Sequence, residues 1–180
     1  MSLPAELRNR IYRFALLNDQ PIIITANSIP EPPLLSASKQ LRSESLSIFY
    51  RENPLICVTD NYNSDSVLLY TCKKKSIKAA YEVIPDMPNQ RRSVDTPNWK
   101  NLVTWIRRCY SDEVALAPPR PTLLDGLAGN VTNDLDGKVV GGTFYAVAQM
   151  PERSWDEIEK FLEQQRSILT TIDARWANDE

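Results

Sequence analysis

The residue types that most enzyme mechanisms need are scarce in this chain. The 180 residues include no histidine, which excludes Ser-His-Asp and Cys-His catalysis, histidine general bases and zinc sites with histidine ligands. The three cysteines, Cys57, Cys72 and Cys109, lack Cys-x-x-Cys spacing and stand among apolar or helix-forming residues. This pattern predicts three buried thiols in a reducing compartment.

Two short segments carry partial versions of ligand-binding motifs. Residues 137–142 place a lysine among glycines but lack the Gly-Lys-Ser/Thr ending of a phosphate-binding loop. Residues 134–137 read Asp-Leu-Asp-Gly, yet a calcium loop aligned on Gly137 would put Thr132 and Thr143 at positions that need carboxylates. We therefore expect a turn at 134–137, no metal site and no cofactor.

The charged clusters are interpreted as solvent-exposed surface and not as catalytic or ligand-binding groups. Four carboxylates of the last predicted helix fall on its outer face: Asp156, Glu157, Glu159 and Glu163. The lysine run 73–75 is typical of a solvated helix end more than of a phosphate patch or an import signal, and the pair 107–108 is interpreted likewise. No catalytic residue is predicted, although a glycosidase that uses two carboxylates stays open because spacing selects no pair.

Composition indicates one globular domain. A chain of this length with 42% apolar and 24% charged residues can bury a sizeable core, and its net charge of −2 gives no field that attracts nucleic acid. No apolar run approaches the roughly 20 residues that cross a bilayer, and no secretory signal is visible. We expect a cytoplasmic or nuclear protein that binds neither nucleic acid nor membrane.

The expected fold class is α+β, a mostly helical single domain with a small sheet of short strands. In the first half, spacing predicts a helix at 4–17, a strand at 21–25, a proline loop at 28–33, a helix at 38–51 capped by Ser36 or Ser38, a strand at 55–58, and a helix from residue 64 or 65 to the lysine run. Residues 77–84 could extend that helix, but their β-formers favour a strand.

The second half alternates proline-rich connections with helices. We expect an exposed connection at 85–97, a helix capped by Thr96 with Pro97 in its first turn, a long loop at 118–137, and a helical segment at 139–150 whose paired Gly141 and Gly142 permit close packing. The last helix opens with a capping box, Ser154 and Glu157. It is expected to bury Trp155, Ile158, Phe161, Leu162, Ile168, Leu169 and Ile172.

The first predicted helix carries one apolar stripe, formed by Leu3, Leu7, Ile11, Phe14 and Ala15. Such a stripe is most often buried, so the pattern favours core packing over contact with a partner. Partner contact would require an exposed patch of several hundred Å², which monomers seldom carry.

Two segments resemble the large set of fungal F-box-like proteins. Residues 3–16 read LPAELRNRIYRFAL and residues 34–50 read LLSASKQLRSESLSIFY. The family pattern is a Leu-Pro-x-Glu-Leu-Arg helix, a variable insert, and a Gln-Leu/Ile-Arg-Ser-Glu-x-Leu-x-x-Phe-Tyr helix leading into a strand. The match covers about the first third of the chain, and residues 98–102 and 173–176 also resemble the C-terminal part of uncharacterised members.

The resemblance implies a non-catalytic protein–protein interaction domain, with an F-box-like N-terminal region at 1–58 and a helical C-terminal region at 59–180 packed with it as one domain. It implies a substrate receptor of a cullin-RING ubiquitin ligase, in which Leu3, Pro4, Leu7 and Ile11 contact a Skp-family adaptor. The alternative is a stand-alone interaction, effector or scaffold protein with no ligase role. The sequence leaves the oligomeric state open.

Overall fold

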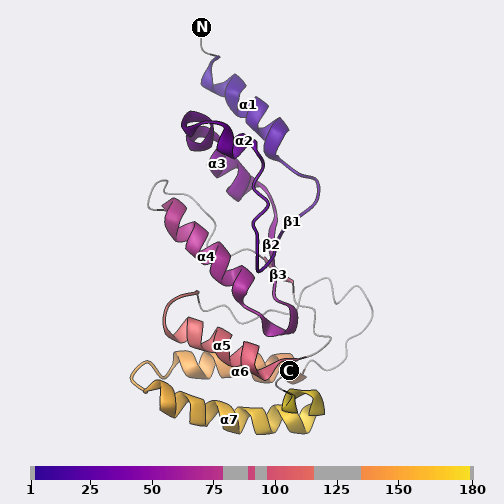
Figure 1. Cartoon of the computed structure of the whole chain (residues 1–180), viewed down its shortest axis with the longest axis vertical. Coiled ribbons are helices and arrows are strands. Elements are labelled where there is room, and N and C mark those ends of the chain that lie inside the picture. Colours follow the sequence, from indigo (N-terminus) through magenta and orange to yellow (C-terminus); the bar gives the residue numbers. More distant parts are fainter. Residues whose placement is uncertain (1–2, 79–88, 92–96, 116–134, 179–180) are drawn as a thin grey trace.

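Short helices dominate the architecture, and a small sheet lies near its middle. The computed structural model describes residues 3–78, 89–91, 97–115 and 135–178. The elements in chain order are α1 (Ala5–Leu16), β1 (Ile22–Ile24), α2 (Leu34–Ala37), α3 (Lys39–Glu52), β2 (Leu55–Val58), η1 (Asp60–Tyr62), α4 (Asp65–Lys78), β3 (Asn89–Arg91), α5 (Trp99–Tyr110), α6 (Leu135–Ala148), α7 (Trp155–Ile172) and η2 (Ala174–Ala177). Figure 1 shows an elongated molecule with α1 at one end and α5, α6 and α7 stacked at the other.

The sheet has three parallel strands in the order β1-β2-β3. Ile22 pairs with Leu55, and Cys57 pairs with both Ile24 and Gln90. Parallel neighbours need a crossover connection, which the α2–α3 pair supplies between β1 and β2 and which α4 begins between β2 and β3. The predicted α+β class, mostly helical with a small sheet of short strands, is confirmed.

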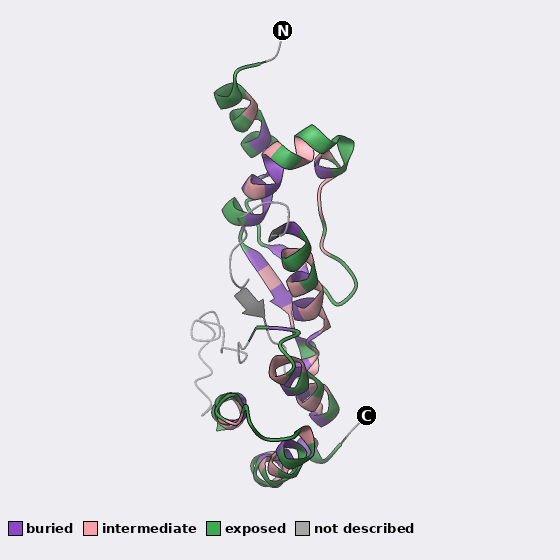
Figure 2. Ribbon diagram, turned by 90° about the vertical axis from the view of Figure 1, so that its left-hand side faces the viewer, coloured by how far each residue is buried: buried purple, intermediate pink, exposed green. Residues whose placement is uncertain are grey.

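The buried apolar side chains form one cluster from Tyr12 to Trp176. In α3, Leu46, Phe49 and Tyr50 are buried. At the other end, Trp105 of α5 meets Phe144 of α6 edge-on with ring centroids 5.5 Å apart. Figure 2 shows that buried positions run the length of the molecule and that exposed ones dominate α1.

Several predicted boundaries shift. The helix expected to end at the lysine run continues to Lys78, so Ile77 and Lys78 are helical where a strand was expected, and residues 79–84 lie outside the described residues. The connection 85–97 contains β3, and its last residue, Pro97, is buried. The cap of α5 is Asn98, whose side chain accepts from the Asn101 amide at 2.9 Å.

Of the predicted local features near α3, α6 and α7, the two helix caps are confirmed and the turn is not. The expected turn at 134–137 is wrong for Leu135–Gly137, which form the first turn of α6, and residues 116–134 lie outside the described residues. Ser38 does cap α3, accepting from the Leu41 amide at 3.1 Å. The capping box at Ser154 and Glu157 is also confirmed.

Some burial predictions fail. Cys57 is buried, but Cys72 is exposed and Cys109 is half-buried. A Cβ added to Gly141 or Gly142 would meet nothing within 4 Å, so the glycines serve no close packing among the described residues. Ile168 and Ile172 of α7 are exposed, because α7 buries a narrower face than its full apolar pattern.

None of the helices in the described residues combines the length and apolar character that a membrane-spanning helix requires.

Candidate protein-binding surface

Helix α1 exposes its most apolar face. Leu3, Leu7, Ile11 and Phe14 are 52%, 45%, 51% and 93% exposed. Steps of four, four and three residues place them on one side of the helix. We call these four residues the α1 stripe. Such a patch is unusual on a protein surface and typically marks an interaction site.

The opposite side of α1 packs against α3 through two residues. Tyr12 is 5% exposed and Leu16 is 2% exposed, and they are one helical turn apart. A fully buried Leu side chain contributes about 1.5–3 kcal/mol through removal of its surface from water. The apolar attachment of α1 therefore lies in its last two turns.

Charged and polar contacts fix which side of α1 faces α3. Arg8 Nε and Tyr12 Oη both donate to Glu44 Oε2, at 2.9 and 2.8 Å. Arg13 forms a bidentate ion pair with Glu52, in which Nε donates to Oε2 at 2.8 Å and Nη2 donates to Oε1 at 2.9 Å. Two carboxylates of α3, two turns apart, thus bind side chains of α1.

Asn53, directly after α3, holds the C-terminal end of α1. Its Nδ2 donates to the Leu16 carbonyl at 2.9 Å and to the Phe49 carbonyl at 3.0 Å. Its Oδ1 accepts from the Asn18 amide at 2.8 Å. This buried side chain uses three of its hydrogen-bonding positions, and a buried amide that lost them would destabilise the fold.

The same contacts set the protonation of their carboxyl groups. Hydrogen bonds from Gln40, Tyr12 and Arg8 hold the pKa of Glu44 below its ordinary value. The hydrogen bond from Arg13 likewise lowers the pKa of Glu52. Both carboxylates are therefore ionised at neutral pH, so the polar attachment of α1 is intact there.

Ion pairs with this much solvent access contribute little free energy, because water and salt screen them. The Arg13 and Glu52 side chains are 50% and 34% exposed. Burial of Tyr12 and Leu16 therefore supplies most of the attachment energy, and the polar contacts select its orientation. The combination keeps the α1 stripe in solvent.

The structure corrects the expectation that this stripe is core. The four predicted contact residues, Leu3, Pro4, Leu7 and Ile11, are all exposed, and they share one end of the molecule. Arg8 Nη1 donates to the Leu3 carbonyl at 2.7 Å and so holds the residue before the helix in place. Contact with an adaptor stays a prediction.

Sequence reasoning missed the residues that orient α1. Tyr12 and Leu16 have i, i+4 spacing opposite the stripe, a signal that was present but weaker than the stripe itself. Glu44, Glu52 and Asn53 lie more than 30 residues away in sequence, and no local pattern connects them to α1.

A second polar cluster centres on Glu31 in the proline loop. Its carboxylate accepts from Tyr50 Oη at 2.5 Å and from Lys73 Nζ at 2.9 Å, and Arg42 Nη1 lies 3.7 Å away. Burial acts to raise the pKa of Glu31, but the hydrogen bonds from Tyr50 and Lys73 and the charge of Arg42 outweigh it, and the pKa lies below its ordinary value. The lysine run is therefore more than a solvated helix end, since Lys73 ties α4 to this loop.

The other predicted charged groups are structural or exposed. Arg108 donates to Ser64 Oγ at 2.8 Å and pairs with Asp65 at 2.7 Å, so it joins α5 to the start of α4. Arg107 lies over the Trp155 ring, 5.2 Å from its centroid. The four carboxylates predicted on the outer face of α7 are exposed there.

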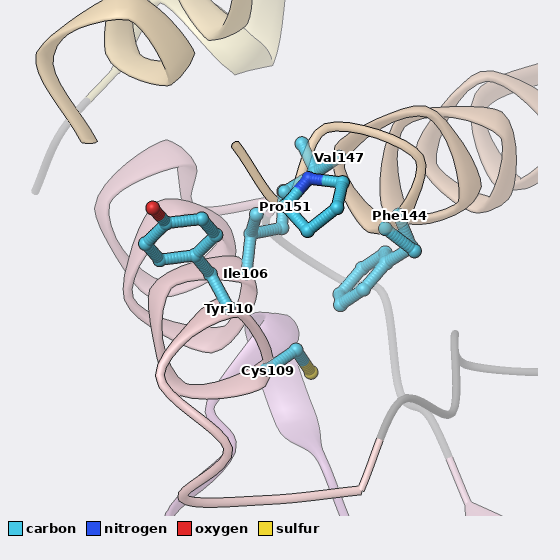
Figure 3. Close-up of a pocket in the computed structure, with 7 residues that line it drawn as sticks. Ile106, Cys109, Tyr110, Phe144, Val147 and Pro151 are labelled. Atoms are coloured by element: carbon cyan, nitrogen blue, oxygen red, sulfur yellow. The ribbon is translucent and has the colours of Figure 1, made fainter. Parts of the chain in front are cut away.

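A cavity of about 370 Å³ lies between α5 and α6. Figure 3 shows its lining by Ile106, Cys109 and Tyr110 of α5, Phe144 and Val147 of α6, and Pro151. The ionisable lining groups are the Cys109 thiol and the Tyr110 hydroxyl, and the hydroxyl donates to the Arg153 carbonyl at 2.6 Å. These lining residues include no carboxylate, lysine or arginine, and within the described ranges no group of cysteine and carboxylate side chains could hold a metal ion.

No protein-family model, curated protein or solved structure matches this chain.

Proposed function

We propose that this chain is a non-catalytic protein-binding domain of F-box-like type, in which the α1 stripe contacts a Skp-family adaptor and the domain serves as a substrate receptor of a cullin-RING ubiquitin ligase. The observation that carries the proposal is the exposure of Leu3, Leu7, Ile11 and Phe14 on a helix whose other side is anchored by polar contacts. A cytoplasmic or nuclear location goes with this function.

The geometry suits a helix that is presented to a partner. An apolar face held rigidly in solvent can enter a hydrophobic groove without first detaching from its own domain. Because Asn53 and the two carboxylates of α3 fix the helix on its far side, binding would not require the α1–α3 contact to open.

The elongated shape also separates two binding regions. Helix α1 lies at one end, and α5, α6 and α7 lie at the other (Figure 1). A substrate receptor must hold its adaptor and its target at the same time, and an arrangement with opposite ends available meets that requirement. The target-binding role of the C-terminal helices belongs to this proposal.

The test compares binding of a purified Skp-family adaptor to the native chain and to two paired variants. Leu7→Ala with Ile11→Ala removes the middle of the α1 stripe. Ile168→Ala with Ile172→Ala is the matched control, because these residues have the same spacing and similar exposure, 48% and 41%, on α7. Binding by the native chain and the α7 variant, and at least about tenfold weaker binding by the α1 variant, is the expected result.

Circular dichroism must show that both variants remain helical. No adaptor binding by the native chain would contradict the proposal and would favour the stand-alone interaction protein. Equal loss in both variants would mean that general hydrophobicity, and not the α1 stripe, accounts for the binding.

A further inference from the structure

The α1 stripe is bordered by two charged residues that have no partner among the described residues. Glu6 and Arg10 are exposed, and neither makes an ion pair or hydrogen bond with any part of the chain that the structure describes. The other two cations of the helix, Arg8 and Arg13, are already engaged by α3. Glu6 and Arg10 are four residues apart, so they lie on the same flank of the stripe.

This order of charges is self-complementary. A two-fold axis perpendicular to two antiparallel helices brings the same flank of each helix together. If the axis passes beside residue 8, midway between Glu6 and Arg10, each Glu6 faces Arg10 of the other copy. The register also places Phe14 of each copy near Leu3 of the other, which covers the most exposed side chain of the stripe.

From this arrangement we infer that the free protein pairs with a second copy of itself through antiparallel α1 helices, and that the adaptor and the second copy compete for the α1 stripe. The position of α1 at one end of the molecule leaves its outer side open to such an approach (Figure 1). The competition rests on the proposed function, whereas the self-association does not.

The contact is small, so the pairing is weak. A helix of 12 residues is about 18 Å long and about 10 Å across, and its face buries on the order of 300 Å² per copy. Stable interfaces bury about 800 Å² per partner. A dissociation constant of about 100 µM is expected, which would let a partner with a full groove displace the second copy.

Sedimentation equilibrium from about 10 µM to about 1 mM tests the self-association. The native chain is expected to shift from monomer to dimer over this range. Glu6→Arg and Arg10→Glu should each weaken the dimer about tenfold, because each places like charges together twice. The Glu6→Arg, Arg10→Glu double variant should recover the native constant.

An equimolar mixture of the two single variants gives the sharpest result. In the mixed dimer, the arginine introduced by Glu6→Arg faces the glutamate introduced by Arg10→Glu, and the native Arg10 of the first variant faces the native Glu6 of the second. Both contacts are then attractive, so the mixture should associate like the native chain. A native chain that stays monomeric at about 1 mM, or single variants that match it, would overturn the inference, as would a mixture that fails to recover. Circular dichroism of each variant checks that the helical content of the chain is unchanged.

The competition is tested by adding adaptor to the native dimer. Conversion to complexes with one copy of each protein supports it, and adaptor that binds the intact dimer overturns it. If the adaptor does not bind at all while the charge-reversal series behaves as expected, the proposed function and the competition are both wrong and the self-association stands.

Discussion

Two substitutions on α1 distinguish its buried face from its exposed face. Leu16→Ala removes most of a side chain that is 2% exposed, and Ile11→Ala removes a similar volume from one that is 51% exposed. Both residues lie in the same helix, about one and a half turns apart. The free energies of unfolding of the two variants should therefore differ because of burial and not because of helix propensity.

The cost of Leu16→Ala combines lost transfer free energy with the cavity left behind, and it falls within about 2–5 kcal/mol for buried Leu. Because α1 sits at one end of the molecule, where the surroundings can relax into part of the space, we expect about 2–3 kcal/mol. For Ile11→Ala the smaller burial is offset by the higher helix propensity of Ala, and a change within about 0.5 kcal/mol is expected.

Urea unfolding followed by circular dichroism gives both free energies of unfolding. Native-state hydrogen exchange of the α1 amides then shows whether Leu16→Ala loosens α1 alone or the whole domain. Equal costs for the two variants, or a larger cost for Ile11→Ala, would mean that the α1 stripe faces the core, and both proposals above would lose their basis.

Three further substitutions test the remaining contacts. The pKa of Glu31 lies below its ordinary value of 4.5. The ionised Glu31 therefore stabilises the fold above about pH 4.5, and this contribution is lost as the pH falls through the pKa of the folded state. In urea unfolding, the difference in free energy of unfolding between Glu31→Gln and the native chain should narrow as the pH falls below about 4.5. Arg108→Ala, which leaves the buried Ser64 hydroxyl without its donor, should cost about 1–2 kcal/mol in urea unfolding, against less than about 0.5 kcal/mol for the exposed Lys100→Ala. Gly142→Ala should raise the free energy of unfolding by about 0.5–1 kcal/mol, because the added Cβ meets open space within a helix, and destabilisation would show that a neighbour packs there.

Local sequence patterns predicted the elements that local forces determine. The three isoleucines of β1 and the apolar residues of β2 form strands as expected, and the capping box fixes the start of α7. Each of these signals lies within a few residues of the structure that it specifies. The parallel pairing of the strands was not predicted, because it depends on crossovers whose direction no short window contains.

The failed predictions depend on distant partners or on exact helix ends. Positive charge is favourable at the C-terminal end of a helix, so the sequence predicts that the α4 lysines are solvated there. Lys73 instead forms an ion pair with Glu31, 42 residues earlier in the chain. The apolar neighbours of Cys72 predict burial, yet it falls on the outer side of α4. Pro97 is expected in the first turn of α5, but the side chain of Asn98 caps the helix one residue later.

The orientation of α1 shows why hydrophobic periodicity alone gives the wrong face. Rotating the helix by half a turn would bury the α1 stripe, which the hydrophobic effect favours. It would also withdraw Tyr12 and Arg8 from Glu44 and move Arg13 away from Glu52. These contacts are individually weak, but they are made together, and they act in the same direction as the burial of Leu16.

Asn53 makes the alternative orientation still less favourable. Its amide binds the carbonyl of Leu16 and the amide of Asn18, at the end of α1, and a helix rolled onto its other side would displace both. A buried amide left without partners costs about 1–3 kcal/mol, and Leu16 would enter solvent in the same step. The polar groups of α3 therefore select the orientation in which the stripe stays exposed, and a chain selected only for stability would have little reason to keep large apolar residues there.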